Sequence, residues 1–338
     1  IVTFIAELSD LELWATDVGN AYLESITKEK VYIVAGPEFG PELEGCTLII
    51  HKALYGLKSS GLRWHERFAD VLRDLGFFPS KAERDIWMRP KGDHYEYIAV
   101  YVDDLLIASK DPGAIIKVLS EKHKFKLKGT RPVSFHLGCD FFRDEEDNLC
   151  YAPKKYIDKM LDNYQRLFGS MPKKAHSPLP KNDHPELDSS ELLNDEETKI
   201  YQSLIGALQW VIQIGRWDIA TAVMSLSRFR AAPRKGHLDR VKRIHGYLLK
   251  MKNGVIRIRT GMPDYSDIPD KVYDWENTVY AGSKEEIPDD CPPPLGKPIL
   301  TTHFVDANLY HCLITGKSVT GILHMWNKTP IDHYSKLQ

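Results

Sequence analysis

Apolar and polar positions alternate along the chain with two different periods. A helical stripe of apolar side chains runs through 62–77 and ends at Gly76. A second helix is predicted over 111–125, because Asp111 supplies a cap and Pro112 suits the first turn. Both segments are therefore expected to be amphipathic helices that each pack one face on a core.

Strand-like runs and a longer helical region complete the pattern. Short runs rich in β-forming residues flank the polar stretch 143–148 and predict a hairpin. From about 153 to 253 the pattern is mostly helical, broken by the polar, Pro-containing stretch 171–190. This order predicts an α+β part followed by an α part, and not a doubly wound sheet.

The apolar run 97–109 contains two adjacent acids, Asp103 and Asp104. In one interpretation they form the two-residue turn of a surface hairpin, which is the commonest hairpin loop length. Against it, the favoured turns have Gly or Asn in the second position. Both flanking strands are also apolar on both faces, as in a sheet that is covered on both sides. The pattern leaves an ordinary turn and a functional site open.

Electrostatics favours the functional site. Two carboxylates roughly 4 Å apart repel by about 4 kcal/mol at an effective dielectric constant near 20. A partly buried pair therefore needs a cation or a shared proton. Asp17 ends another apolar run, and a third acid at the same place would make a divalent cation such as Mg²⁺ almost obligatory.

Length and composition set outer limits. The chain has 338 residues, which predicts two or three domains, and 43% of them are hydrophobic. No apolar run approaches the roughly 20 residues that cross a bilayer. The five cysteines are sparse and show no paired spacing, which argues against a zinc site or a disulfide framework. Neither end carries a targeting pattern, so we expect the chain to come from inside a longer polypeptide.

Charge is unevenly distributed although the formal net charge is only −2. The segment 231–260 carries nine Lys and Arg against the single acid Asp239, and the next thirty residues reverse the sign. A nucleic-acid surface is expected on this basic segment, although a solvated helix face is the commoner meaning of a charge run. The acidic stretch ends in the Pro-rich 287–298 and predicts an extended connector.

Four stretches, in this order, look like the polymerase motifs of a reverse transcriptase. They are TDVGNAYLE (16–24), KALYGLKSSGLRWHERF (52–68), YVDDLLIAS (101–109) and FKLKGTRPVSFHLGCDF (125–141). KALYGLK followed by a Trp is typical of copia-type LTR retrotransposons. The stretch 201–229 resembles the region that follows in the same polyproteins, and 306–338 resembles the start of their ribonuclease H domain. The resemblance covers essentially the whole chain.

The resemblance implies a fold and a domain division. It implies a right-hand polymerase palm, an antiparallel sheet with helices on one face, over 1–150, with most of the fingers missing upstream. A helical thumb and connection would occupy 151–260, and the acidic, Pro-rich linker 261–299. A truncated, β-rich start of a ribonuclease H would occupy 300–338.

The resemblance also implies the catalytic residues. Asp17, Asp103 and Asp104 would be the catalytic acids and, with the backbone carbonyl of Val18, would hold two Mg²⁺ ions, with Mn²⁺ as an alternative. Two such ions suit the transfer of a deoxynucleotide to a primer 3′-hydroxyl. Tyr22 falls where relatives place the aromatic side chain that blocks a 2′-hydroxyl, although a core tyrosine is the alternative.

Further contacts follow by the same resemblance. Gly56 and Lys58 would lie at the deoxynucleotide, with Gly56 allowing a close backbone approach, although residues 59–62 depart from the pattern of relatives. Trp64 and Phe68 are expected in the core. The remaining implied contacts are with the primer, for Tyr101, His136, Leu137 and Gly138, and with the duplex at the thumb, for Lys242 and Arg243.

The implied partners are an RNA template, a DNA primer, deoxynucleotides and the rest of the Pol polyprotein, without a membrane. The family implies a cytoplasmic virus-like particle and the nucleus as locations. Asp306 would be a vestigial ribonuclease H acid, and because only Asp332 follows it, that activity is expected to be absent. The missing fingers predict weak or no polymerase activity of this piece alone. An inactive relic, a nucleic-acid-binding remnant and an unrelated two-metal enzyme are the alternatives.

Overall fold

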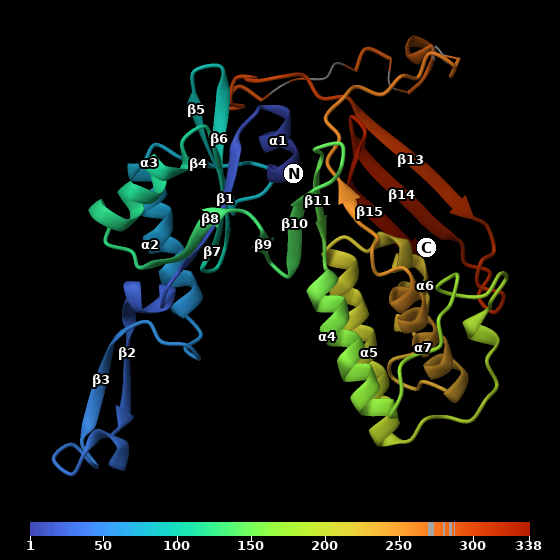
Figure 1. Ribbon diagram of the computed structural model, residues 1–338, viewed down its shortest axis with the longest axis horizontal. Coiled ribbons are helices and arrows are strands. Elements are labelled where there is room, and N and C mark those ends of the chain that lie inside the picture. Colours follow the sequence, from blue (N-terminus) through green and yellow to red (C-terminus); the bar gives the residue numbers. More distant parts are fainter. Residues whose placement is uncertain (270–273, 280, 284–285, 287) are drawn as a thin grey trace.

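The computed structural model describes residues 1–269, 274–279, 281–283, 286 and 288–338 (Figure 1). Its largest sheet is antiparallel and six-stranded, in the order β4-β5-β6-β7-β1-β8. The strands are β1 (Glu12–Val18), β4 (Phe78–Pro79), β5 (Ile86–Lys91), β6 (His94–Tyr101), β7 (Asp104–Ser109) and β8 (Leu127–Pro132). The α+β organisation of the first part of the chain is therefore confirmed.

Helices cover both faces of this sheet. The helices α2 (Ser60–Asp74) and α3 (Pro112–Lys117) share a core with Leu105 and Ile107 of β7. The short helix α1 (Val2–Leu8) packs on the opposite face, where Leu106 and Ala108 point. The expectation of helices on one face is thus wrong, because successive apolar residues of β7 point to opposite faces and both faces need cover.

The predicted helix ends are found at the end of α2 and at the start of α3, but α3 is shorter than expected and continues as the π-helix Val118–Lys122. Trp64, Phe68 and Leu72 lie one turn apart on α2 and are buried, as predicted for core positions. After α2, Gly76 adopts a φ of +82° that favours glycine. At α3 the Asp111 carboxylate accepts a 3.0 Å hydrogen bond from the Ala114 amide, which confirms the cap.

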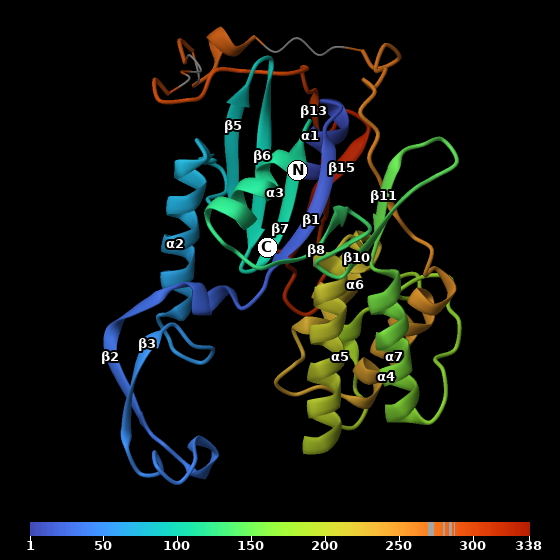
Figure 2. The same cartoon turned by 60° about the vertical axis from the view of Figure 1, so that its left-hand side comes forward.

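An arm that the sequence pattern did not predict extends from the sheet. The strands β2 (Ile26–Val34) and β3 (Thr47–Lys52) form a two-stranded hairpin that projects away from the rest of the molecule (Figures 1 and 2). Apolar side chains such as Tyr32 and Val34 are exposed on it.

A second, four-stranded sheet joins distant parts of the chain. It has the order β12-β11-β10-β9, and its strands are β9 (Phe135–His136), β10 (Cys139–Arg143), β11 (Leu149–Ala152) and β12 (Ile256–Arg257). The hairpin predicted around 143–148 is the β10–β11 pair. The expected domain boundary at residue 150 lies within β11.

The predicted helical region consists of α4 (Lys154–Phe168), α5 (Asp195–Gln213), α6 (Ala220–Ser227) and α7 (Lys235–Lys250). Its core includes Tyr201, Leu208, Val223 and Ile244, one or more from each of α5, α6 and α7. Apolar residues of α4 join the same core, which confirms the helical part.

The end of the chain is a three-stranded antiparallel sheet, in the order β13-β14-β15, of β13 (Thr301–Asn308), β14 (Val319–Trp326) and β15 (Thr329–Leu337). It lies beside α6 (Figure 1), and Thr221 of α6 is within 3.1 Å of Ser335, hydroxyl to hydroxyl. Part of the expected linker 261–299 lies outside the described residues. No helix in the described ranges is both long and apolar enough to cross a membrane.

Candidate functional site

Strand register brings the three predicted acids together. In the β1–β7 pair, Asp17 lies directly opposite Asp104, and the Val18 amide donates a 2.8 Å hydrogen bond to the Asp103 carbonyl. Side chains of directly opposed residues share one face of a sheet. The structure thus joins two segments of the sequence at the end of β1.

The turn differs from the one that the sequence pattern suggested. Tyr101 pairs with Asp104, so the two-residue loop is Val102–Asp103, and Asp104 is the first residue of β7. Val102 has a φ of +57°, which is unusual for a β-branched residue and costs about 1–3 kcal/mol. The indole of Trp64, only 2% exposed, donates a 2.5 Å hydrogen bond to the Val102 carbonyl and holds this turn.

Negative charge accumulates at this point. Partial burial raises the pKa of Asp104 above its ordinary value, and the neighbouring Asp103 and Asp17 raise it further. Within the described ranges, none of the three carboxylates forms an ion pair or a side-chain hydrogen bond. Three carboxylates without an ion-pair partner among the described residues, next to the backbone carbonyl of Val18, are a donor set that suits a hard divalent cation.

The carboxylates are not yet converged as metal ligands. No group of three His, Cys, Asp or Glu side chains in the described part of the chain is arranged to hold a metal ion. A cation bound at Asp17, Asp103 and Asp104 would therefore have to draw their carboxyl groups together. The residue types and the local charge fit such an ion.

The residues predicted to contact the deoxynucleotide lie in two adjoining segments of the chain. Tyr22, in the short 3₁₀ helix Ala21–Glu24, contacts Tyr55 with ring centroids 4.5 Å apart. Gly56 has a φ of +98° and open space around it, so glycine is required here by backbone conformation. In the described part of the chain, no atom beyond the two chain neighbours of Gly56 lies within 4 Å of a Cβ placed on it, so lack of space does not explain the glycine at this position. Lys58 is exposed in the same loop.

The predicted primer hairpin is a tight turn against the helical region. Leu137 and Gly138, between β9 and β10, have φ values of +46° and +84°. A Cβ at Gly138 would lie 3.8 Å from the Trp210 indole nitrogen, so α5 backs this turn. Burial lowers the pKa of His136 to about 4, so its imidazole is neutral at pH 7 and offers no positive charge to a phosphate. Tyr101 is exposed at the other hairpin.

The basic segment 231–260 is largely paired within the protein. The Lys242 ammonium lies 3.6 Å from Asp239 and over the Phe168 ring, and Arg243 donates to the Ser177 hydroxyl at 3.1 Å. The partners of the other seven are Ser190 for Arg234, Glu191 for Lys235, Asp183 and Asp188 for Arg240, His176 for Lys250, Asp158 for Lys252, Asp144 for Arg257 and Glu146 for Arg259. These cations are less available to nucleic acid than their sequence suggested.

Asp306 lies on β13 opposite Gly321, which in turn pairs with Ser335. Asp332 pairs with His324. The β14 partners of the two acids, Gly321 and His324, are three positions apart, and residues an odd number of positions apart on a strand point to opposite faces. Asp306 and Asp332 therefore also point to opposite faces of the sheet. Asp332 therefore cannot share a cation with Asp306.

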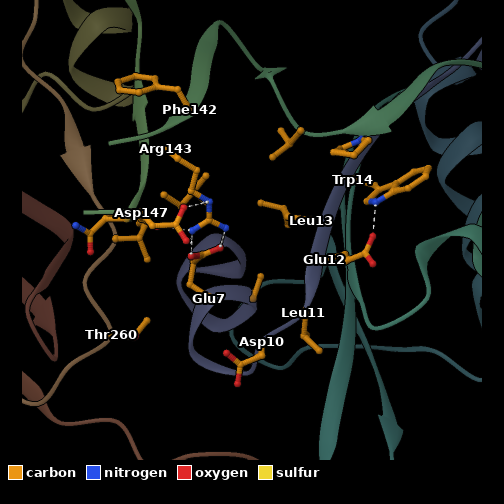
Figure 3. A pocket seen from close by; sticks show the side chains of 16 residues that line it. Glu7, Asp10, Leu11, Glu12, Leu13, Trp14, Phe142, Arg143, Asp147 and Thr260 are labelled. Carbon is orange, nitrogen blue, oxygen red and sulfur yellow. Dashed lines mark hydrogen bonds and ion pairs between the residues drawn. The ribbon is translucent and has the colours of Figure 1, made fainter. Parts of the chain in front are cut away.

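A large pocket lies away from the acids. It has a volume of about 720 Å³ and lies between α1, β1 and the β10–β11 hairpin, at the Glu12 end of β1 (Figure 3). Its charged side chains have partners: Arg143 binds both carboxylate oxygens of Glu7, at 2.5 and 2.8 Å, and Asp10 pairs with Lys297 at 2.8 Å. The pair of Glu7 with Arg143 joins α1 to the four-stranded sheet, and the three acids lie at the opposite end of β1.

Two side chains near the acids were missed by sequence reasoning. Lys128 lies opposite Asp17 on β8, on the same face of the sheet. Tyr55 lies beside Tyr22. Burial is the largest cause of its raised pKa, and Asp103, Tyr22 and Asp17 raise this pKa further. Both residues lie inside the quoted motifs, but their positions near the acids follow only from the strand register for Lys128 and from the ring contact with Tyr22 for Tyr55.

Comparison with known proteins gives a consistent result. Residues 1–174 match the family described as reverse transcriptase (RNA-dependent DNA polymerase). A putative transposon Ty5-1 protein of Saccharomyces cerevisiae is 30% identical over 248 residues, which cover 72% of this chain and 79% of that protein.

Two plant relatives are much longer than this chain. The retrovirus-related Pol polyprotein from transposon RE1 of Arabidopsis thaliana is 29% identical over 80% of this chain and 18% of its own length. The corresponding polyprotein from transposon TNT 1-94 of Nicotiana tabacum is 30% identical over 73% of this chain and 19% of its own length. The chain thus spans under a fifth of these polyproteins. It belongs to the reverse transcriptase (RNA-dependent DNA polymerase) family and is a fragment of a copia-type retrotransposon Pol polyprotein.

Proposed function

We propose that this chain carries the polymerase centre of an RNA-directed DNA polymerase, with Asp17, Asp103 and Asp104 as its catalytic acids. The single observation that carries the proposal is the pairing of Asp17 with Asp104 across β1 and β7, where none of the three acids forms an ion pair within the described part of the chain. Two Mg²⁺ ions, or Mn²⁺, bound there would activate the primer hydroxyl and neutralise the triphosphate.

The protein groups would hold and orient the reactants. Asp17 and Asp103 would bind through their carboxylates and Val18 through its carbonyl, while Asp104 would contribute mainly negative charge. The hydrogen bond from Trp64 to Val102 would keep the Val102–Asp103 turn in place. Lys128, on the same face as Asp17, offers a cation to the triphosphate.

Substrate contacts would surround these acids. Tyr22 would exclude ribonucleotides by meeting a 2′-hydroxyl, and the loop of Gly56 and Lys58 would line the nucleotide. Tyr101 and the turn of His136, Leu137 and Gly138 would hold the primer, with His136 acting as a neutral hydrogen-bonding group. The helical region would bind the RNA–DNA duplex as a thumb, with Lys242 and Arg243 as weak contributors.

The six-stranded sheet with its helices would be the palm, and 300–338 would be the start of a ribonuclease H without activity of its own. Other parts of the Pol polyprotein would complete the nucleotide site. The proposed setting is a cytoplasmic virus-like particle followed by the nucleus.

Primer extension tests the proposal. The chain, with and without the upstream polyprotein residues, is supplied with poly(rA)·oligo(dT), TTP and Mg²⁺ or Mn²⁺. Extension that depends on the metal and disappears in Asp103→Asn supports it. Asp70→Asn is the matched control, because Asp70 is exposed on α2 and pairs only with Arg73. Equal extension by Asp103→Asn and the parent chain would overturn the assignment. Duplex binding without extension in either form would favour the inactive remnant.

A further inference from the structure

Tyr22 is held between two other parts of the fold. On one side its ring contacts Tyr55, with planes inclined by 44°. On the other side its hydroxyl lies 4.0 Å from where a Cβ on Gly61 would stand, at the start of α2. The ring also packs against the core of α2 and the large sheet. Tyr55 is thus the part of this enclosure that lies outside the core.

The backbone fixes both tyrosines relative to each other. The Ser25 amide donates to the Tyr22 carbonyl at 3.0 Å, and the Ala53 amide donates to the Ser25 carbonyl at the same distance. The Ser60 hydroxyl, which is buried, donates a 2.6 Å hydrogen bond to the Leu54 carbonyl. The loop that carries Tyr55 is therefore tied to the segment that carries Tyr22 and to α2.

Tyr55 also faces the acids. Its pKa is raised by burial and by the charges of Asp103 and Asp17, so its hydroxyl stays protonated at neutral pH and remains a hydrogen-bond donor. Yet the residue is 62% exposed, which is unusual for a tyrosine that serves only to fill a core. The exposed Tyr55 ring thus contacts Tyr22 and feels the charges of the acids.

We propose that Tyr55 is a positioning residue for sugar discrimination, whose ring fixes the orientation of Tyr22 at the nucleotide site. The inference rests on the proposed polymerase activity and on Tyr22 as the residue that excludes a 2′-hydroxyl. The Tyr22 ring can exclude a 2′-hydroxyl only while it keeps its orientation, and the Tyr55 ring in contact with it would prevent it from rotating away. The Tyr55 ring is sufficient for this role, and its hydroxyl is not required.

Steady-state extension with TTP and with UTP measures the discrimination. In the full chain that supports extension, Tyr55→Ala is expected to lower the ratio of kcat/KM for TTP to that for UTP by roughly two- to tenfold, the value of one aromatic contact. Tyr55→Phe keeps the ring and is expected to restore the parent ratio. Tyr32→Ala is the matched control, because Tyr32 and Tyr55 are both 62% exposed and Tyr32 lies on the arm.

An unchanged ratio in Tyr55→Ala, or an equal loss in Tyr55→Phe, would overturn the inference. If the chain extends no primer either alone or with its upstream polyprotein residues, the polymerase proposal fails, and a second measurement still tests the pairing of Tyr55 with Tyr22. A 3-fluorotyrosine at position 22 gives a ¹⁹F NMR signal that reports how its ring is held. Tyr55→Ala is expected to shift and narrow this signal, whereas Tyr32→Ala leaves it unchanged. No change with Tyr55→Ala would overturn the pairing itself.

Discussion

At the scale of single residues, the candidate site is a concentration of like charge that the protein leaves unneutralised. A carboxyl group whose pKa is raised in the folded state disfavours folding once it ionises. For Asp104 this loss of stability begins as the pH rises through its unfolded value near 3.8 and is complete above its raised folded value. At neutral pH the ionised Asp104 carboxylate therefore destabilises the folded chain unless a cation binds beside it.

This cost can be measured by removing one charge. Asp104→Asn is expected to raise the Tm at pH 7 without divalent cations, because one repelling carboxylate is gone. Adding Mg²⁺ is expected to raise the Tm of the parent chain more than that of the variant, since ligand binding stabilises the form that binds more tightly. Differential scanning fluorimetry between pH 4 and 8 checks both. A variant that is less stable than the parent throughout would contradict the account.

Trp64 links the core to the Val102–Asp103 turn through one hydrogen bond. Trp64→Phe preserves most of the buried ring but leaves the Val102 carbonyl unpaired, and it is expected to cost about 1–3 kcal/mol of unfolding free energy. Urea unfolding measures this cost. If the turn positions Asp103, extension by the folded variant also falls in kcat, with KM for TTP little changed. A fall in stability with normal kcat would restrict Trp64 to a structural role.

At the scale of elements, local signals in the sequence predicted what local interactions determine. The ends of α2 and α3 follow from Gly76 and from the Asp111 cap, and both are correct. The arm of β2 and β3 was missed because its strands bury few side chains and so lack a clear alternation. The position of the turn was also missed by one residue, because the positive φ of Val102 has no sequence signal.

The helix α7 shows why a charge run is a weak predictor of ligands. Its cations face acids that lie far away in the sequence, such as Asp183 and Asp188 for Arg240. Arg240→Ala leaves these two partly buried acids without their cation and is expected to destabilise the chain by about 3 kcal/mol. Thermal unfolding checks this, and Lys235→Ala, whose pair with Glu191 is exposed, is the control expected to change stability little.

The same pairing limits how α7 can bind nucleic acid. The double variant Lys242→Ala and Arg243→Ala is expected to lower the slope of log Kd against log salt for an RNA–DNA duplex by less than about one, because both cations already have protein partners. Fluorescence anisotropy over a salt series measures the slope. A reduction of about two would show that both side chains leave these partners for phosphates.

At the scale of the whole molecule, the arrangement of the acids could not be derived from periodicity. Asp17 and Asp104 meet because β1 lies between β7 and β8 in the sheet, and no local pattern specifies that order. The resemblance to reverse transcriptases supplied the pairing that the residues alone left open. It did not supply Tyr55 or Lys128 as neighbours of the acids, since those follow from the observed register and ring contacts.

The strand order has a consequence for how the chain acquires its site. β1 is synthesised before both of its neighbours in the sheet, β7 and β8, which begin only at Asp104 and Leu127. Such a long sequence separation makes closure of the sheet slow. Until β7 leaves the ribosome, β1 has neither of its neighbours in the sheet. The cluster of acids therefore exists only after β7 has paired with β1, and metal binding during synthesis would report that pairing.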